Sequence, residues 1–141
     1  MDDPYQLKRF LDAQNRSGTY ETAVSELRRG QKMGHWMWFI FPQVTGLGRS
    51  HMAQEFAISS AAEAQAYLRH PVLGPRLREC AQILLGIDGK SAREILGGID
   101  AVKLRSSMTL FMSAEPAEPV FREVLAKYFD GSPDQETIIR L

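Results

Sequence analysis

Apolar residues recur every three or four positions along most of the chain. Leu7 and Phe10 begin one such run, and Leu73 and Leu77 begin a longer one. Because an α-helix has about 3.6 residues per turn, this spacing gathers the apolar side chains on one helix face. Alternating strand patterns are scarce, and the one candidate, FIFPQV, contains Pro42, which argues against a central strand. The pattern therefore predicts an all-α fold.

Capping signals divide the chain into separate helices. Ser60 and Ser91 are each followed three residues later by a glutamate, which is the capping-box pattern of a helix N-terminus. Pro119 suits the first position of a helix, and Gly30 suits the residue just after a helix end. These signals predict one compact domain over residues 1–141, built from seven or eight short helices.

The composition fits a globular domain and narrows the classes of partner. The chain has 141 residues, of which 44% are apolar, enough for one domain with its own core. Seventeen basic and 17 acidic residues balance, and a pI near 6.8 gives no general attraction to nucleic acid or to an anionic membrane. The apolar run from Trp36 to Val44 is far shorter than the roughly 20 residues of a membrane span. We expect neither a nucleic-acid nor a membrane partner.

Cysteine and histidine usage argues against a metal centre. The single cysteine, Cys80, excludes an internal disulfide, and it lies on an apolar helix face where an inert thiol is expected. His35, His51 and His70 have no spacing that places two of them on one helical turn. We therefore expect no metal and no cofactor. The acidic start MDDPYQLKRF does not resemble a secretory signal, which together with the lone cysteine predicts a cytoplasmic location.

The stretch HWMWFIFPQVTGLGRS holds both tryptophans. If His35 to Phe41 is helical, the helix is apolar all round, which is typical of a central, buried helix. The alternative is the wall of a pocket, because the indoles of Trp36 and Trp38 can stack on planar or cationic ligands. His35, at the polar edge, is then a candidate acid or base near neutral pH.

A glycine-rich turn follows the aromatic residues directly. Gly46 and Gly48 allow positive φ angles or a close approach of the backbone to a ligand. Ser50 can cap a short following helix, whose free N–H groups would favour an anion. Arg49 adds a fork of donors for phosphate or carboxylate, and Gln43 lies at the rim. A plain connecting turn remains the alternative interpretation.

A second polar group lies in the segment KLRSSMTLF. On a helix its apolar residues form one stripe, whereas Lys103, Ser106 and Ser107 lie off that stripe. Two cations, Lys103 and Arg105, then stand close to several hydroxyl groups. The segment is either a solvated helix face or part of a site for a phosphate or a polyol.

The stretches HWMWFIFPQVTGLGRS, AYLRHPVLGPRLREC and KLRSSMTLF together resemble the DUF1810 family of small bacterial and fungal proteins of unknown function. The resemblance covers most of the chain and implies an all-helical fold. The chain also faintly resembles the NADAR superfamily of YbiA-like proteins, which implies N-glycosidase chemistry on ADP-ribose-type compounds. The aromatic helix of that superfamily carries a glutamate that residues 35–41 lack. Glu55 or Glu26 would take its role if the fold brings one of them to the site.

The leading hypothesis is a pocket walled by Trp36 or Trp38, with the turn from Gly46 to Ser50 as its anion-binding rim. Its ligand would be an anionic, partly planar metabolite such as a nucleotide or an ADP-ribose derivative. If the protein is an enzyme, we expect cleavage of an N-glycosidic bond with His35 and Glu55 as catalytic groups. The alternative is a non-catalytic interaction or oligomerisation module with an exposed patch at Trp38 and Phe41. The sequence leaves the oligomeric state open.

Overall fold

A computed structural model describes residues 2–141 and confirms the all-α prediction. In chain order the helices are α1 (Lys8–Asn15), the 3₁₀ helix η1 (Arg16–Gly18), α2 (Thr19–Arg28), α3 (Met37–Ile40), α4 (His51–Glu55), α5 (Ala61–Arg69), α6 (Leu73–Leu85), α7 (Ala92–Leu96), α8 (Gly98–Ala114), α9 (Pro119–Phe129) and α10 (Gln135–Ile139). The helical segments outnumber the expected seven or eight. The additional ones are single turns that lie between stronger sequence signals.

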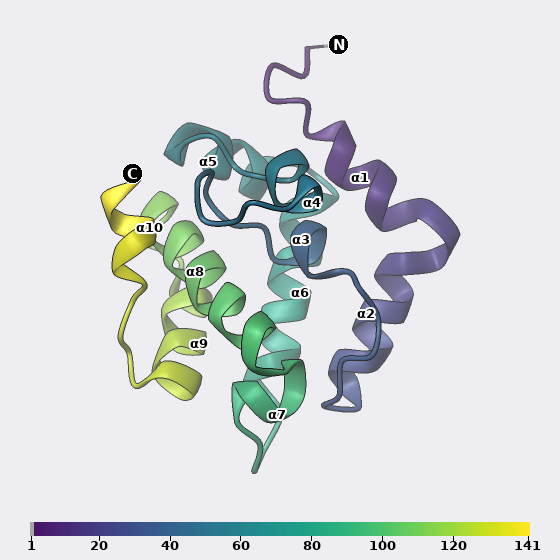
Figure 1. Ribbon diagram of the computed structural model, residues 1–141, viewed down its shortest axis with the longest axis vertical. Coiled ribbons are helices and arrows are strands. Elements are labelled where there is room, and N and C mark those ends of the chain that lie inside the picture. The colour runs from purple at the N-terminus through teal and green to yellow at the C-terminus, as the bar shows by residue number, and fades with distance from the viewer. Residues whose placement is uncertain (1) are drawn as a thin grey trace.

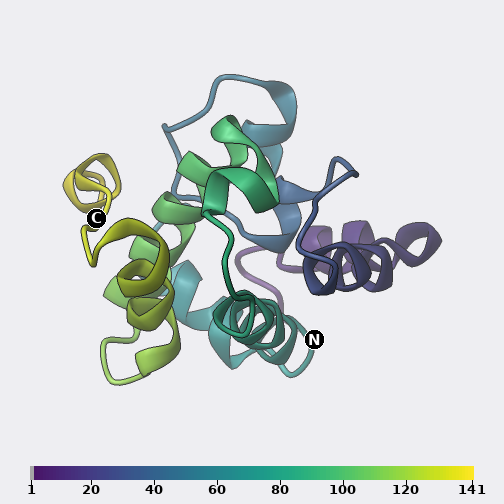
Figure 2. The ribbon, with the colours of Figure 1, turned by 90° about the horizontal axis from the view of Figure 1, so that it is seen from below.

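Helix α8 is the longest helix and packs against α5, α7, α9 and α10. Helix α6 runs behind it and contacts both α2 and α9. Figures 1 and 2 show the resulting arrangement, with α1 and α2 on one side of α6 and with α9 and α10 on the other. The core is rich in aromatic residues, and Phe10, Tyr67 and Phe111 are completely buried within it.

The aromatic stretch forms only one helical turn, α3, rather than a helix from His35 to Phe41. Trp36 precedes the turn with φ −123° and ψ 4°, and Phe41 follows it with φ −126° and ψ 75°. Pro42 comes next and has no N–H with which to continue the helix. Beyond it the chain is extended, and Val44 forms an isolated parallel bridge with Ile58. The candidate strand FIFPQV thus contributes only a single bridge, in agreement with the argument from Pro42.

Several helix ends follow the sequence signals. Ser91 and Glu94 form a complete capping box at α7, with both reciprocal hydrogen bonds present. The Ser60 hydroxyl accepts from the Glu63 N–H, but the Glu63 carboxylate accepts from Ser59 instead of completing the box. Glu63 is nevertheless held, because Arg9 of α1 donates to its other carboxylate oxygen at 2.9 Å. This partly buried ion pair ties α1 to the start of α5.

No helix within residues 2–141 has the length and apolar character needed to cross a membrane. The cytoplasmic location stays a prediction.

Candidate functional site

One pocket brings together the two polar segments singled out in the sequence. It encloses about 460 Å³ between the glycine loop (residues 46–50), the start of α4 and the first turns of α8. Its lining residues are Gln43, Leu47, Gly48, Arg49, Ser50, Ala53, Ile99, Val102 and Lys103. The loop and the Lys103 segment are far apart in the sequence, and they form opposite sides of one cavity.

The conformation of the glycine loop is fixed by packing. Gly46 has φ +94°, and its backbone lies against the side chain of Arg140, which follows α10, so that a Cβ there would come 3.0 Å from the Arg140 Nε. At Gly48 an added Cβ would lie only 2.6 Å from the Cβ of Ala53. Ser50 caps α4 by accepting a hydrogen bond from the Ala53 N–H at 3.1 Å. Both glycines are therefore explained by close neighbours within the protein, whether or not a ligand binds.

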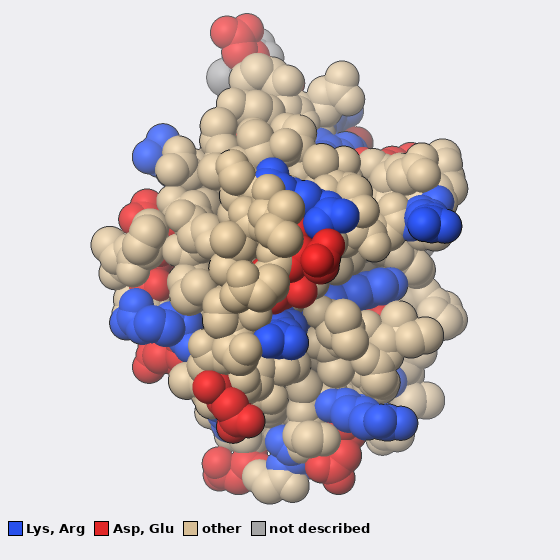
Figure 3. Space-filling model, turned by 60° about the vertical axis from the view of Figure 1, so that its left-hand side comes forward, with Lys and Arg blue, Asp and Glu red and all other residues tan. Residues whose placement is uncertain are grey.

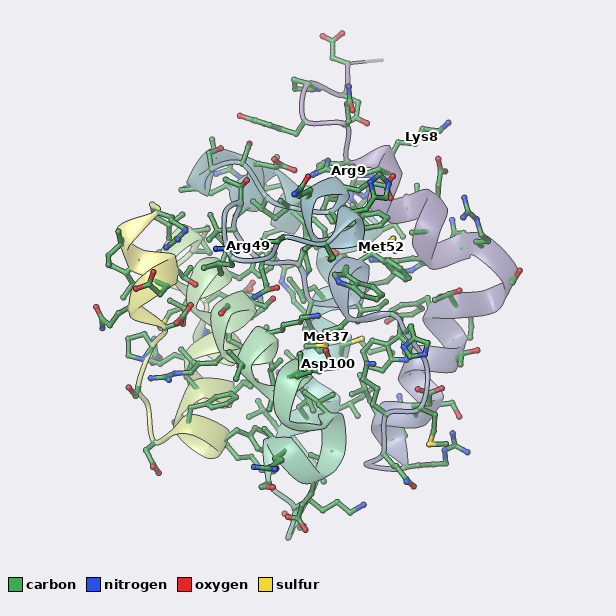
Figure 4. The ribbon with its side chains drawn as sticks, viewed as in Figure 1. Lys8, Arg9, Met37, Arg49, Met52 and Asp100 are labelled. Atoms are coloured by element: carbon green, nitrogen blue, oxygen red, sulfur yellow. The ribbon has the colours of Figure 1, made fainter. Side chains whose placement is uncertain are left out.

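Two cations face the pocket in different ways. The Arg49 side chain is exposed and forms no ion pair or hydrogen bond with residues 2–141. The backbone carbonyl oxygen of Arg49 accepts a hydrogen bond from the Gln54 side chain. The Lys103 side chain is 24% exposed, and its Nζ lies 3.6 Å from a carboxylate oxygen of Asp100. The same Nζ lies 5.1 Å from the ring centre of Trp38. Figure 4 shows Arg49 on the loop and Asp100 below it on the first turn of α8.

A second lysine stands behind Asp100. Lys32, from the segment between α2 and α3, brings its Nζ to 2.8 Å from Asp100. Its side chain is 8% exposed, and its ammonium lies 5.0 Å from the ring centre of Trp36. Asp100 therefore shares its charge between a buried lysine and the lysine that lines the pocket.

The remaining wall of the pocket is apolar. Leu47 and Ala53 contribute to it from the loop and α4. Ile99 and Val102 contribute from α8 and are 78% and 64% exposed. The pocket thus combines two exposed, branched apolar side chains with two cations. This combination suits a ligand that has both an anionic and an apolar part.

The face of the molecule shown in Figure 3 carries no broad basic surface. On the face shown in Figure 3, Lys and Arg side chains alternate with Asp and Glu, and neutral residues surround both. Near the pocket, Arg140 is paired with Glu136 at 2.9 Å. On this face the positive charge is local, which suits a small anion better than a long polyanion.

The structure does not bring the two catalytic candidates together. His35 is exposed ahead of α3 and does not line the pocket. Glu55, at the end of α4, lines a separate cleft of about 530 Å³ beside Arg9. Its carboxylate lies 3.8 Å from the His51 Nε2, on the exposed side of α4.

Trp36 belongs to the core rather than to a pocket wall. It is 2% exposed, and its indole N–H donates to Oε1 of Glu26 at 2.9 Å. The N–H groups of Met33 and Gly34 donate to the same oxygen. Burial raises the pKa of the Glu26 carboxyl, but these three donors outweigh it and leave the pKa below its ordinary value. Glu26 thus organises the loop that carries Lys32.

The segment KLRSSMTLF has two separate roles. Arg105 donates to the carbonyl and hydroxyl oxygens of Ser132 at 2.9 and 2.7 Å. Ser106 donates to the Asp134 carboxylate at 2.8 Å. These two residues therefore fix the segment that leads into α10 and do not line the pocket. Ser107 faces the interior, where its Oγ is buried without a hydrogen-bond partner in the described part of the chain.

Sequence reasoning missed Lys32, Asp100, Ile99 and Val102. The i, i+3 spacing of Asp100 and Lys103 was a signal for one ion pair on a helix. No local pattern connects Lys32 with Asp100, because the contact depends on how the loop after α2 crosses α8. The exposed apolar pair could be recognised only once the helix face was known.

Comparisons with known proteins agree on a group without an assigned activity. Residues 4–141 match the family described as "Protein of unknown function (DUF1810)". Among solved structures, the chain is similar to the conserved hypothetical protein Rv1873 from Mycobacterium tuberculosis, with 51% identity and a TM-score of 0.95. The match covers 99% of this chain and 98% of that one. No curated protein matches the chain. The resemblance to the NADAR superfamily stays a prediction.

Proposed function

The chain belongs to the DUF1810 family, whose function is unknown, and we therefore propose from the geometry alone that the protein binds a small anionic metabolite. The site is the pocket between the glycine loop and α8. The observation that carries this proposal is that Arg49 and Lys103, from distant parts of the sequence, line the same cavity of about 460 Å³.

The charges in the pocket favour an anion. Arg49 presents a guanidinium that no acceptor within residues 2–141 engages, and Lys103 adds an ammonium that Asp100 contacts only at 3.6 Å. A guanidinium can bind a carboxylate or phosphate through two parallel hydrogen bonds. A bound anion would therefore gain two charge-assisted contacts without displacing a strong internal one.

The size and lining of the pocket favour a metabolite with an apolar or planar part. A volume near 460 Å³ is within the usual range of small-molecule sites, roughly 300–1,000 Å³. Ile99 and Val102 offer an exposed apolar surface next to the cations, and Leu47 faces them from the loop. Nucleotides and ADP-ribose derivatives combine a planar base with an anionic group in this way.

The geometry supports binding more directly than cleavage of an N-glycosidic bond. Such cleavage needs an acid or a carboxylate beside the breaking bond. The pocket is lined by no aspartate, glutamate or histidine of the part of the chain that the structure describes. His35 and Glu55 would need a ligand that reaches well beyond the pocket.

The alternative, an interaction module, has weaker support. It called for an exposed patch at Trp38 and Phe41, but Phe41 is completely buried and Trp38 is partly covered. Ile99 and Val102 are exposed, yet they border a cavity rather than a flat patch.

The test compares AMP with adenosine, which differ in the phosphate group, by thermal shift and calorimetry. ADP-ribose and NAD extend the series. A ligand at 100 times its Kd adds about 2.7 kcal/mol to stability. We expect a shift with the anionic compounds that is lost in Arg49→Ala and kept in Arg122→Ala, a matched change of an exposed arginine on α9. Equal shifts with adenosine, or an unchanged response in Arg49→Ala, would contradict the proposal.

A further inference from the structure

Three charged residues lie in a row between the rings of two tryptophans, next to the pocket. Along this row, the Trp36 ring contacts Lys32, Lys32 contacts Asp100, Asp100 contacts Lys103, and Lys103 contacts the Trp38 ring. The row begins in the core at Trp36 and reaches the pocket through Lys103, which is a lining residue. One carboxylate thus serves two ammonium groups.

The two lysines hold Asp100 unequally. Lys32 is 2.8 Å from the carboxylate and 8% exposed, whereas Lys103 is 3.6 Å away and 24% exposed. Coulomb attraction grows as the separation falls and as water is excluded. Lys103 is therefore the partner that an incoming anion can take. Asp100 would keep Lys32 and would not be left as an unpaired buried charge, which is the costly outcome.

We infer that the ligand carries a dianionic phosphate monoester, which takes Lys103 from Asp100 and pairs it with Arg49. This inference rests on the proposed binding function and specifies its ligand class. A phosphate monoester carries about −1.5 to −2 charges at neutral pH, which matches the two cations that face the pocket. Its terminal oxygens can accept from both the guanidinium and the ammonium.

Asp100 makes this site selective. A carboxylate ligand would only replace the Asp100 carboxylate as the partner of Lys103. It would therefore gain little beyond its contact with Arg49. A phosphate monoester offers Lys103 nearly twice the charge of Asp100. Asp100 is therefore a positioning residue that holds Lys103 over Trp38 until a dianion arrives, and it discriminates against monoanions.

Three probes with one planar body separate the charge states. Phenyl phosphate is the dianion, phenyl sulfate has a similar tetrahedral shape with one charge, and benzoate is the carboxylate. Each is titrated into the ¹⁵N-labelled full-length protein, and the indole N–H signal of Trp38, assigned with Trp38→Phe, follows the Lys103 ammonium. We expect phenyl phosphate to bind at least about fivefold more tightly than either monoanion, as one surface-type ion pair would provide. We also expect it to shift the Trp38 signal.

A charge-neutral double variant tests Asp100 itself. Asp100→Asn alone would strand the buried Lys32, so it is combined with Lys32→Met, which leaves the net charge unchanged. No carboxylate of the protein then competes with the ligand for Lys103. All three probes should bind more tightly, and the affinities of benzoate and phenyl sulfate should rise most. Lys32→Met alone leaves Lys103 as the remaining lysine partner of Asp100. The ion pair between them should strengthen, and the affinity for all three probes should fall.

The outcomes distinguish the inference from the proposed function. Equal affinities for phenyl phosphate and phenyl sulfate in the unaltered protein overturn the inference while leaving an anion site in place. If the double variant Lys32→Met/Asp100→Asn keeps the same relative affinities for the three probes, the inference is likewise overturned and the anion site is retained. If the double variant does not fold, the comparison of the three probes on the unaltered protein still decides. Failure of every anionic probe, including AMP, to bind overturns the proposed function and the inference together.

Discussion

The indole N–H of Trp36 donates to Oε1 of Glu26 at 2.9 Å, and both residues are almost completely buried. Two backbone N–H groups, from Met33 and Gly34, share the same oxygen. One carboxylate oxygen thus satisfies three donors and fixes the loop that leads from α2 to α3. Because Lys32 lies on this loop, the contact between Glu26 and Trp36 also positions the row of charges behind the pocket.

Glu26→Gln should destabilise the protein by about 1–3 kcal/mol at pH 7, because a neutral amide is a weaker acceptor for three buried donors. The pKa of Glu26 is lower in the folded state than its ordinary value, so its contribution is present at neutral pH. That contribution is lost as the pH falls from the ordinary glutamate range through the folded-state pKa.

Urea denaturation of both proteins at pH 7 and at several lower pH values measures this effect. The difference in unfolding free energy should shrink as the pH falls. A difference that stays constant down to pH 3 would show that the charge of Glu26 contributes nothing. Glu123→Gln, an exposed change on α9, is the control and should have the same stability as the unaltered protein within about 0.5 kcal/mol.

Gly48→Ala should cost about 1–3 kcal/mol, because the new Cβ would come 2.6 Å from that of Ala53. The double variant with Ala53→Gly removes the opposing methyl group. It should recover part of the loss, less about 1 kcal/mol for glycine in a helix. Thermal unfolding of the unaltered protein, Gly48→Ala, Ala53→Gly and the double variant provides a complete double-mutant cycle. Additive losses would mean that the two residues do not meet.

Ser106→Ala should loosen α10 without unfolding the core, because it removes the hydrogen bond to Asp134. Arg105→Ala removes three further hydrogen bonds to Ser132 and Pro133 and should have a larger effect. Hydrogen–deuterium exchange should rise in residues 132–141 and stay unchanged in α6. Faster exchange throughout the chain would instead indicate global destabilisation, and no change would show that α10 is held by other contacts.

Cys80 should be unreactive in the folded protein. It is completely buried on α6, and burial raises the pKa of its thiol to about 12. Since the thiolate is the reactive form, a disulfide reagent such as DTNB should not label it at pH 8 on a timescale of minutes. One equivalent should react at once in denaturant. Rapid labelling under native conditions would show that α6 opens readily.

Features of the fold that depend on residues close together in the sequence could be predicted. The capping box at Ser91 and Glu94 and the start of α9 at Pro119 agree with the structure, because each depends on contacts within one turn. The helix considered for residues 35–41 proved to be the single turn Met37–Ile40. Its apolar pattern could not reveal that Trp36 would leave helical geometry to reach Glu26, a contact that no periodicity encodes.

The candidate site was only partly predictable, for the same reason. Gln43, Gly48, Arg49, Ser50 and Lys103, all singled out as candidates from the sequence, line one pocket, and whether that pocket binds a ligand stays a prediction. Arg105 and Ser106 belong to the same motif as Lys103, but the helix turns them toward α10. A helix face can be predicted from sequence, whereas the element that covers that face depends on the tertiary fold.

Helix α10 and the residues that flank it contact both the glycine loop and α8 without lining the pocket. Arg140, directly after the helix, lies against Gly46 of the glycine loop, and the segment that precedes the helix is bound to α8 through Arg105 and Ser106. The C-terminal segment thus connects the glycine loop with α8, the two elements that border the pocket. We therefore expect substitutions in this segment to change the shape of the pocket without changing a lining residue, so relatives with identical pocket residues would differ in the ligands that the proposed site accepts.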